Sequence, residues 1–190
     1  QNIIGPDLEL FDRLQEASGH TIRILAIAPE LPGAMALIER LAPSMTISLA
    51  HTAAGYDDAI KAFDAGASQL THIFNAMPGL HHREPGVIGA AMDAKAAAEL
   101  ICDGFHIHPA VVRAVFRMFG PERVILISDS MRACGLENGL YDLGGQQVRL
   151  TNGKATLADG TLAGSASSLL QCLRNAVAYG IRQIGRASCR

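Results

Sequence analysis

Residues 46–74, TISLAHTAAGYDDAIKAFDAGASQLTHIF, hold one complete repeat of strand, helix and strand. The β-branched run at 46–50 predicts a buried strand, the apolar spacing over 56–65 predicts an amphipathic helix, and 69–74 predicts the next strand. A helix that connects two strands is typical of parallel pairing, because parallel neighbours need a crossover connection. This stretch therefore predicts a parallel α/β sheet.

The same unit recurs along the chain. Further strands are expected at 22–28, 99–102 and 123–128, and further helices at 32–41 and 109–119. The strands follow one another at intervals close to the length of a βα unit, which is too regular for an antiparallel sandwich. Either a doubly wound sheet or a (β/α)8 TIM barrel fits this spacing.

Polar residues stand at one end of these strands. His51, His72, Asp103 and Asp129 each lie at or just beyond the C-terminal end of a different expected strand. In a TIM barrel that face holds the active site, which is built from several strands at once. No GxGxxG or GxxxxGK[ST] loop supports a dinucleotide or nucleoside-triphosphate site. We therefore expect the barrel.

The pattern changes after Asp129. Residues 141–157, YDLGGQQVRLTNGKATL, alternate apolar and polar residues across an Asn152-Gly153 turn, which predicts a hairpin-like insertion. The small-residue loop DGTLAGSASS at 159–168 then opens a helical stretch at 169–179. Backbone N–H groups there are able to hold an oxyanion or a sugar hydroxyl, although a plain N-cap is the commoner explanation.

Composition excludes several classes of protein. The 190 residues carry a net charge of -2 with scattered Lys and Arg, so we expect no nucleic-acid surface. No apolar run approaches the roughly 20 residues of a membrane helix, so we expect no membrane partner. The four cysteines form no CxxC pair, and reduced structural thiols in a cytoplasmic protein are the expectation.

Two histidines and an aspartate are the candidate catalytic centre. His51 and His72 end neighbouring strands, so their rings can converge on a metal ion. Each alone is better explained as a hydrogen-bonded strand-end histidine, but the pair favours metal ligation. Asp129, at the end of the apolar run in ILISDS, is suited to act as a general base beside metal-bound water, with a loop cap as the alternative.

His106 and His108 form an HxH pair that also invites a metal assignment. Because Asp103-Gly104 breaks the strand, their two rings need not meet the ion at His51 and His72. We expect His106 to contact substrate and His108, at a helix start, to be structural. Arg83 is able to supply charge for an anionic substrate, with an ordinary surface arginine as the alternative. The remaining histidines are expected to face solvent: His20, His81 and His82.

Five segments of the chain carry a family pattern. They are IAPELPGA (27–34), the long stretch 48–91, CDGFHIHP (102–109), ISDSMRACG (127–135) and DGTLAGSASSL (159–169). The most specific part is THxxNAMxxxxxREPG, in register with AHT upstream and with DGxH and SDxM downstream. Together they resemble N-acetylglucosamine-6-phosphate deacetylases, barrels of the amidohydrolase superfamily, over nearly all of residues 6–180.

The resemblance implies a role for each matching position. His51 and His72 match two ligands of a catalytic divalent metal, Zn2+ or Fe2+. Asp129 matches the aspartate that activates water and protonates the leaving amine. The positions that hold the sugar phosphate are Asn75, Ala76, Arg83 and His106, and the loop at the sugar and its acyl end is Leu162, Ala163 and Gly164. In this family the arginine reaches a neighbouring subunit, which implies a homodimer of the full-length protein.

The implied reaction converts N-acetylglucosamine 6-phosphate to glucosamine 6-phosphate and acetate, in amino-sugar metabolism. Two alternatives stay open: a catalytically silent fragment that binds metal or sugar phosphate weakly, and another amidohydrolase acting on a cyclic amide. Family members carry a glutamate ligand and a histidine upstream that this chain lacks, and Glu30 is expected to be structural rather than a substitute. Residues 181–190, IRQIGRASCR, also depart from the family pattern. Residues 1–190 are therefore expected to form one incomplete barrel domain.

Overall fold

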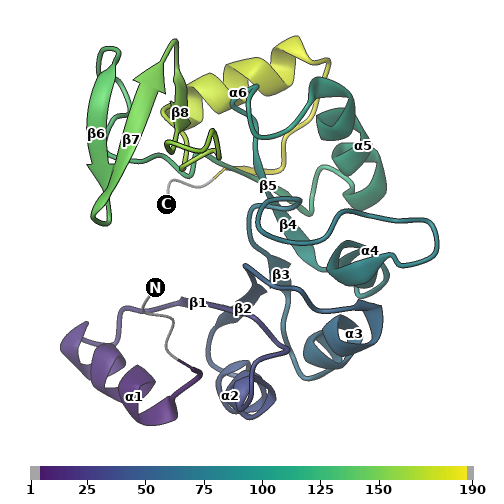
Figure 1. Ribbon diagram of the computed structural model, residues 1–190. Coiled ribbons are helices and arrows are strands. Elements are labelled where there is room, and N and C mark those ends of the chain that lie inside the picture. Colours follow the sequence, from purple (N-terminus) through teal and green to yellow (C-terminus); the bar gives the residue numbers. More distant parts are fainter. Residues whose placement is uncertain (1–4, 188–190) are drawn as a thin grey trace. The chain divides into compact units, whose positions relative to one another are not determined.

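The computed structural model describes residues 5–187, and the chain divides into two compact units, Gln1–Ala98 and Glu99–Arg190 (Figure 1). The first unit contains helices α1 (Leu8–Ala17), α2 (Ala34–Leu41), α3 (Tyr56–Asp64) and α4 (Gly86–Asp93), and strands β1 (Ile24–Ile27), β2 (Thr46–Leu49) and β3 (Gln69–Leu70). Strand β4 (Ala97–Ile101) begins at the end of this unit.

The strands of the first unit are parallel. Leu49 of β2 lies beside Ile27 of β1 on one side and beside Leu70 of β3 on the other, and Gln69 lies beside Ala97 at the start of β4. Helices α2, α3 and α4 are the crossover connections that make this pairing possible. The pairing confirms the expected parallel α/β sheet.

The second unit combines parallel and antiparallel pairing. Strands β5 (Val124–Ile127) and β9 (Arg186–Ala187) are parallel, whereas β6 (Gly139–Leu143), β7 (Gln146–Thr151) and β8 (Lys154–Thr156) form an antiparallel sheet. Its helices are α5 (Pro109–Phe119) and α6 (Leu169–Ala178). Asn152 and Gly153 both have positive φ, 51° and 80°, as a tight hairpin turn requires.

Most of the expected elements are present, with one clear error. The strand expected at 69–74 is wrong beyond Leu70, because the backbone enters a turn at 71–76. His72 and Phe74 have φ of 31° and 73°, values that end a β ladder. Among residues 5–187, no helix is long and apolar enough to span a membrane.

A glycine at the end of α3 tests the packing of the first unit. Gly66 has φ of 110°, and a Cβ placed there would lie 2.5 Å from the Cβ of Ala42. We expect Gly66→Ala to lower the free energy of unfolding by about 2 to 4 kcal/mol through backbone strain and overpacking. Urea denaturation measures this loss. Gly79→Ala is the matched control, because no atom lies within 4 Å of its added Cβ; equal losses in both variants would contradict the packing described.

Candidate functional site

His51 and His72 converge at the ends of β2 and β3. Their Nε2 atoms are 2.9 Å apart, and their rings meet edge to face with centroids 4.6 Å apart. His72 is buried and His51 is exposed. This is the convergence expected from the sequence.

The pair fits two positions of a divalent-metal site. At metal–nitrogen distances of 2.0 to 2.1 Å, two imidazoles on one ion have nitrogens about 2.9 Å apart at a right angle and about 3.3 Å apart in a tetrahedron. The observed 2.9 Å lies at the near end of that range. Across residues 5–187, no group of three or more His, Cys, Asp and Glu side chains is placed to hold an ion. The described residues thus supply a two-histidine arrangement.

Three candidate residues share an unusual backbone conformation. His51, His72 and Asp129 have φ of 46°, 31° and 47°, and each follows the end of a parallel strand. This left-handed region costs L-residues of order 1 to 3 kcal/mol and clusters at functional sites. Other non-glycine residues, Lys95 and Asn152 among them, also have positive φ, so this conformation is consistent with a functional role for the three candidates but does not by itself assign one.

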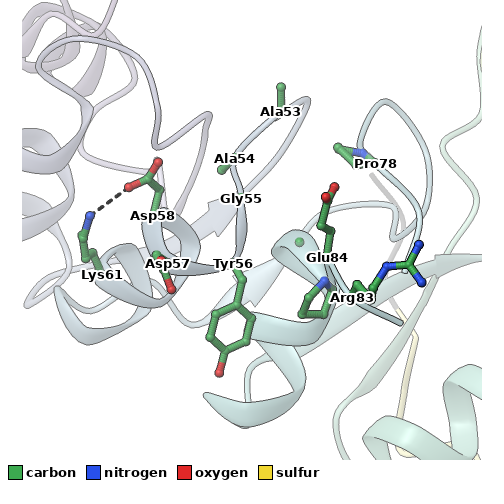
Figure 2. A pocket seen from close by; sticks show the side chains of 12 residues that line it. Ala53, Ala54, Gly55, Tyr56, Asp57, Asp58, Lys61, Pro78, Arg83 and Glu84 are labelled. Atoms are coloured by element: carbon green, nitrogen blue, oxygen red, sulfur yellow. Dashed lines mark hydrogen bonds and ion pairs between the residues drawn. The ribbon is translucent and has the colours of Figure 1, made fainter. Parts of the chain in front are cut away.

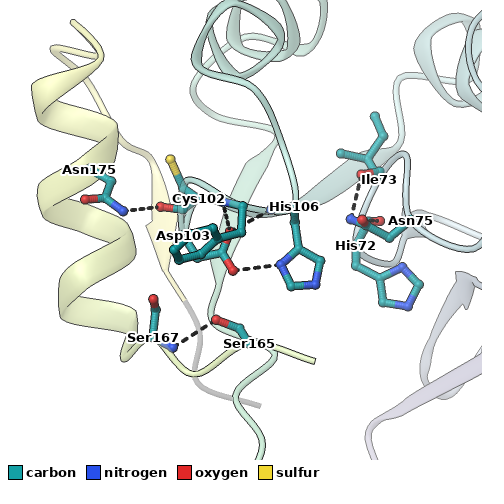
Figure 3. A network of polar contacts seen from close by, with 10 residues as sticks. His72, Ile73, Asn75, Cys102, Asp103, His106, Ser165, Ser167 and Asn175 are labelled. Atoms are coloured by element: carbon teal, nitrogen blue, oxygen red, sulfur yellow. Dashed lines mark hydrogen bonds and ion pairs between the residues drawn. The ribbon is translucent and has the colours of Figure 1, made fainter. Parts of the chain in front are cut away.

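Asn75 braces the turn that carries His72. Its side-chain Nδ2 donates to the carbonyl oxygens of His72 and Ile73 at 3.1 and 3.3 Å (Figure 3). Neighbouring Ala76 is exposed and has φ of 50°. With the amide oriented this way, the Oδ1 atom of Asn75 is the part of its side chain suited to accept a hydrogen bond from a ligand.

Glu30 is a structural carboxylate, as expected. It accepts hydrogen bonds from Thr52 Oγ1 at 2.5 Å and from Ala53 N at 2.6 Å. These contacts tie the turn after β1 to the residues that follow His51. Glu30 therefore supports the backbone behind the histidine pair.

Asp129 and the small-residue loop lie together in the second unit. The carbonyl of Asp129 accepts from Ser165 N at 2.9 Å, and the carbonyl of Ser165 accepts from Met131 N at 2.8 Å. A Cβ on Gly164 would approach the Asp129 carbonyl to 3.4 Å, and Gly164 has φ of 68°. The structure thus brings Asp129 beside the loop that contains Leu162, Ala163 and Gly164.

A second polar cluster follows β4. The imidazole Nδ1 of His106 lies 2.7 Å from Asp103 Oδ2, and the two side chains are 7% and 2% exposed. Burial alone raises the pKa of Asp103, but hydrogen bonds from the side chain and backbone of His106 outweigh it and hold this pKa below its ordinary value. The sequence predicts both residues near the strand ends but does not predict their contact, for which a DxxH spacing across a turn is only a weak signal.

Arg83 lies in a different setting, at a cavity of 710 Å³ beside α3 (Figure 2). Its guanidinium Nη1 is 2.7 Å from His82 Nε2, and the side chain is exposed. Asp58 and Lys61, which form an ion pair at 2.9 Å, line the same cavity. The cavity therefore has both signs of charge.

The structure also describes residues that the sequence places outside the candidate catalytic centre. His108 is structural: it precedes α5, and its Nδ1 accepts from Ala110 N at 3.2 Å. The start of α6 is an ordinary cap, because Ser168 accepts from Gln171 N. Cys102 is a buried free thiol, and burial raises its pKa to about 12, which makes it a poor nucleophile. The histidines expected to face solvent are exposed: His20, His81 and His82.

Comparison with known proteins bears on this arrangement. No family model matches the chain. An N-acetylglucosamine-6-phosphate deacetylase of Lysinibacillus sphaericus is 42% identical over 175 residues, which cover 91% of this chain and 45% of that protein. An N-acetylgalactosamine-6-phosphate deacetylase of Escherichia coli O157:H7 is 44% identical and covers 87% of this chain and 44% of that protein.

A solved structure of a deacetylase is also similar to this chain. The N-acetyl-D-glucosamine-6-phosphate deacetylase of Mycobacterium smegmatis matches with a TM-score of 0.89 and 38% identity, over 95% of this chain and 48% of that one. The chain is a relative of the N-acetylglucosamine-6-phosphate deacetylases. The resemblance seen in its motifs is confirmed, and the chain spans less than half the length of each of these deacetylases.

The left-handed backbone at Asp129 can be tested in this deacetylase relative. Glycine adopts φ of 47° without steric cost, whereas a β-branched residue does not. We expect Asp129→Gly to be as stable as the parent chain and Asp129→Val to lose about 1 to 3 kcal/mol of unfolding free energy. Thermal and urea denaturation provide the comparison. A valine variant as stable as the glycine variant would show that residue 129 does not have this conformation.

Proposed function

We propose that the chain carries a large part of a metal-dependent deacetylase site that hydrolyses the acetamide of N-acetylglucosamine 6-phosphate. The observation that carries the proposal is the His51–His72 pair, with Nε2 atoms 2.9 Å apart at the ends of adjacent strands. The names of the relatives supply the reaction and the substrate class.

Each residue has a definite task in the proposed reaction. His51 and His72 would hold the divalent cation, Zn2+ or Fe2+, which supplies Lewis acidity to the water and the acetamide carbonyl. Asp129 accepts a proton as water adds to the carbonyl carbon, and later gives that proton to the departing nitrogen. The C–N bond breaks, and acetate and the free amino sugar phosphate leave. Asp129 is exposed, which leaves its carboxylate accessible to a substrate.

The remaining candidates have the chemistry needed to recognise a phosphosugar. Arg83 and His106 are cationic or potentially cationic groups suited to phosphate oxygens, while Asn75 and the Ala76 backbone offer neutral hydrogen bonds. The loop of Leu162, Ala163 and Gly164, next to the Asp129 backbone, would contact the sugar and its acyl group. These assignments transfer from the family position by position.

We further propose that the whole protein is a cytoplasmic homodimer built on a (β/α)8 barrel, to which residues 1–190 contribute one part of a single domain. The parallel βα units of the first unit support the barrel. Exposed Arg83, which matches an arginine that reaches a partner subunit in the family, supports the dimer. The absence of a basic stripe argues against nucleic-acid partners.

A second substrate is favoured by a specific observation. The relative from Escherichia coli O157:H7, which is 44% identical, is named for N-acetylgalactosamine 6-phosphate, the epimer at one sugar hydroxyl. Both epimers carry the same acetamide and phosphate. Discrimination between them would therefore depend on the contacts to the sugar ring rather than on the proposed metal ligands.

Metal binding tests the histidine pair directly. In the protein that contains this chain, we expect His51→Asn and His72→Asn each to weaken Zn2+ binding at least about tenfold. The reason is that each substitution removes one ligand. Isothermal titration calorimetry measures the affinity. The matched control is His81→Asn/His82→Asn, which removes another pair of neighbouring rings, 4.3 Å apart. If only the control weakens binding, the proposed ligands are wrong.

Hydrolysis tests the reaction. Both epimeric substrates are incubated with the same protein in the presence of Zn2+ or Fe2+, and acetate release is followed. We expect Asp129→Asn to reduce kcat at least about a hundredfold, because general acid–base groups contribute at least that much. Asp142→Asn, a change at an exposed strand residue, is the control. The deacetylase proposal fails if neither epimer is hydrolysed or if Asp129→Asn keeps the parent rate.

A further inference from the structure

Both carboxylate oxygens of the buried Asp103 are engaged by groups of the turn after β4. Asp103 Oδ1 accepts from the backbone N–H groups of Phe105 and His106, both at 2.9 Å. Its other oxygen, Oδ2, lies 2.7 Å from the Nδ1 atom of the His106 ring (Figure 3). One carboxylate therefore fixes both the backbone and the ring of the same histidine.

This arrangement determines where the ring proton is. An ionised carboxylate accepts hydrogen bonds and donates none, so the proton in the 2.7 Å contact belongs to Nδ1 of His106. In the neutral ring Nε2 then carries a lone pair, and in the charged ring Nε2 carries a proton that an anion can accept. The depressed pKa of Asp103, caused by hydrogen bonds that outweigh its burial, is consistent with the ionised form.

Helix α6 supports the turn from behind. The side-chain Nδ2 of Asn175 donates to the carbonyl of Cys102 at 2.9 Å. Gly104 has φ of 89°, and a Cβ there would lie 3.0 Å from the hydroxyl of Tyr179, just beyond the end of the helix. The turn is thus confined, and the Asp103–His106 geometry is pre-organised.

We propose that Asp103 is a positioning residue that keeps the proton of the neutral His106 ring on Nδ1, which leaves the lone pair of Nε2 to accept a hydrogen bond from a hydroxyl group of a phosphosugar. The role of His106 as a substrate contact rests on the proposed function. The tautomer itself does not, because it follows from contacts within the turn. A carboxylate that orients a neighbouring imidazole is a recurring way to fix its tautomer.

Asp103→Asn separates positioning from a merely structural role. The two backbone donors at Oδ1 require an oxygen there, so the amide NH2 of asparagine must take the place of Oδ2 and face His106 Nδ1. Because Nδ1 then has to accept, its proton moves to Nε2. The variant keeps the backbone contacts of the turn but inverts the tautomer.

Nitrogen-15 NMR of the histidine rings measures which ring nitrogen of His106 carries the proton and does not require an active enzyme. At a pH at which the ring is neutral, we expect protonated Nδ1 and unprotonated Nε2 in the parent chain, and the reverse in Asp103→Asn. His106→Gln assigns the signals, and Asp7→Asn, which alters a carboxylate that accepts Leu10 N, is the control. A parent ring protonated at Nε2 overturns the proposal even if Asp103→Asn does not fold.

Steady-state kinetics on the phosphosugar complete the test. We expect Asp103→Asn to raise KM about tenfold with kcat changed less than about threefold, as for a lost binding contact. An inverted tautomer with unchanged KM would overturn the role of His106 at the substrate while leaving hydrolysis intact. Absence of hydrolysis in the parent would overturn the proposed function alone, since the NMR result stands by itself.

Discussion

The candidate metal site depends on the parallel register between β2 and β3. Leu49 pairs with Leu70, and each histidine follows its strand partner by two residues, so both rings leave the sheet at one level. The buried hydroxyls of Ser48, within β2, and Thr71, directly after β3, are 2.6 Å apart and connect the two segments beside this pair. A slip of one residue would displace one ring by about 3.3 Å along the strand. Two nitrogens so displaced could not share one ion.

The same register explains why the strands stop where they do. A strand that continued past Leu49 or Leu70 would turn alternate side chains to opposite faces of the sheet. The left-handed conformations of His51 and His72 end both ladders at equal height and turn the two rings toward each other. The backbone strain at these two residues thus accompanies the convergence of their rings, in a unit whose helices α3 and α4 pack against each other.

The sequence predicted the parallel units because buried strands and amphipathic helices have different periods. It failed at 71–74 because burial does not require pairing: Ile73 is fully buried although the ladder has already ended at Leu70. It anticipated the His51–His72 convergence, since strand ends in a parallel sheet meet at one edge. It missed the Asp103–His106 contact, because a hydrogen bond across a turn depends on φ of Gly104, which no hydrophobic pattern encodes.

Polar side chains at these strand ends serve two different purposes. Where the backbone leaves the ladder it loses its hydrogen-bond partners, and a nearby side chain has to replace them. Glu30 does so after β2, Asn75 after β3 and Asp103 after β4.

A sequence pattern alone does not separate such a structural residue from a ligand, since both are polar residues at the end of a strand. Contact geometry separates the two. Both carboxylate oxygens of Glu30 accept hydrogen bonds from the turn after β2, whereas the Nε2 atom of His51 faces another imidazole ring. The residues whose role is hardest to assign from sequence are therefore those that, like Asp103, hold the backbone and orient a ring at the same time.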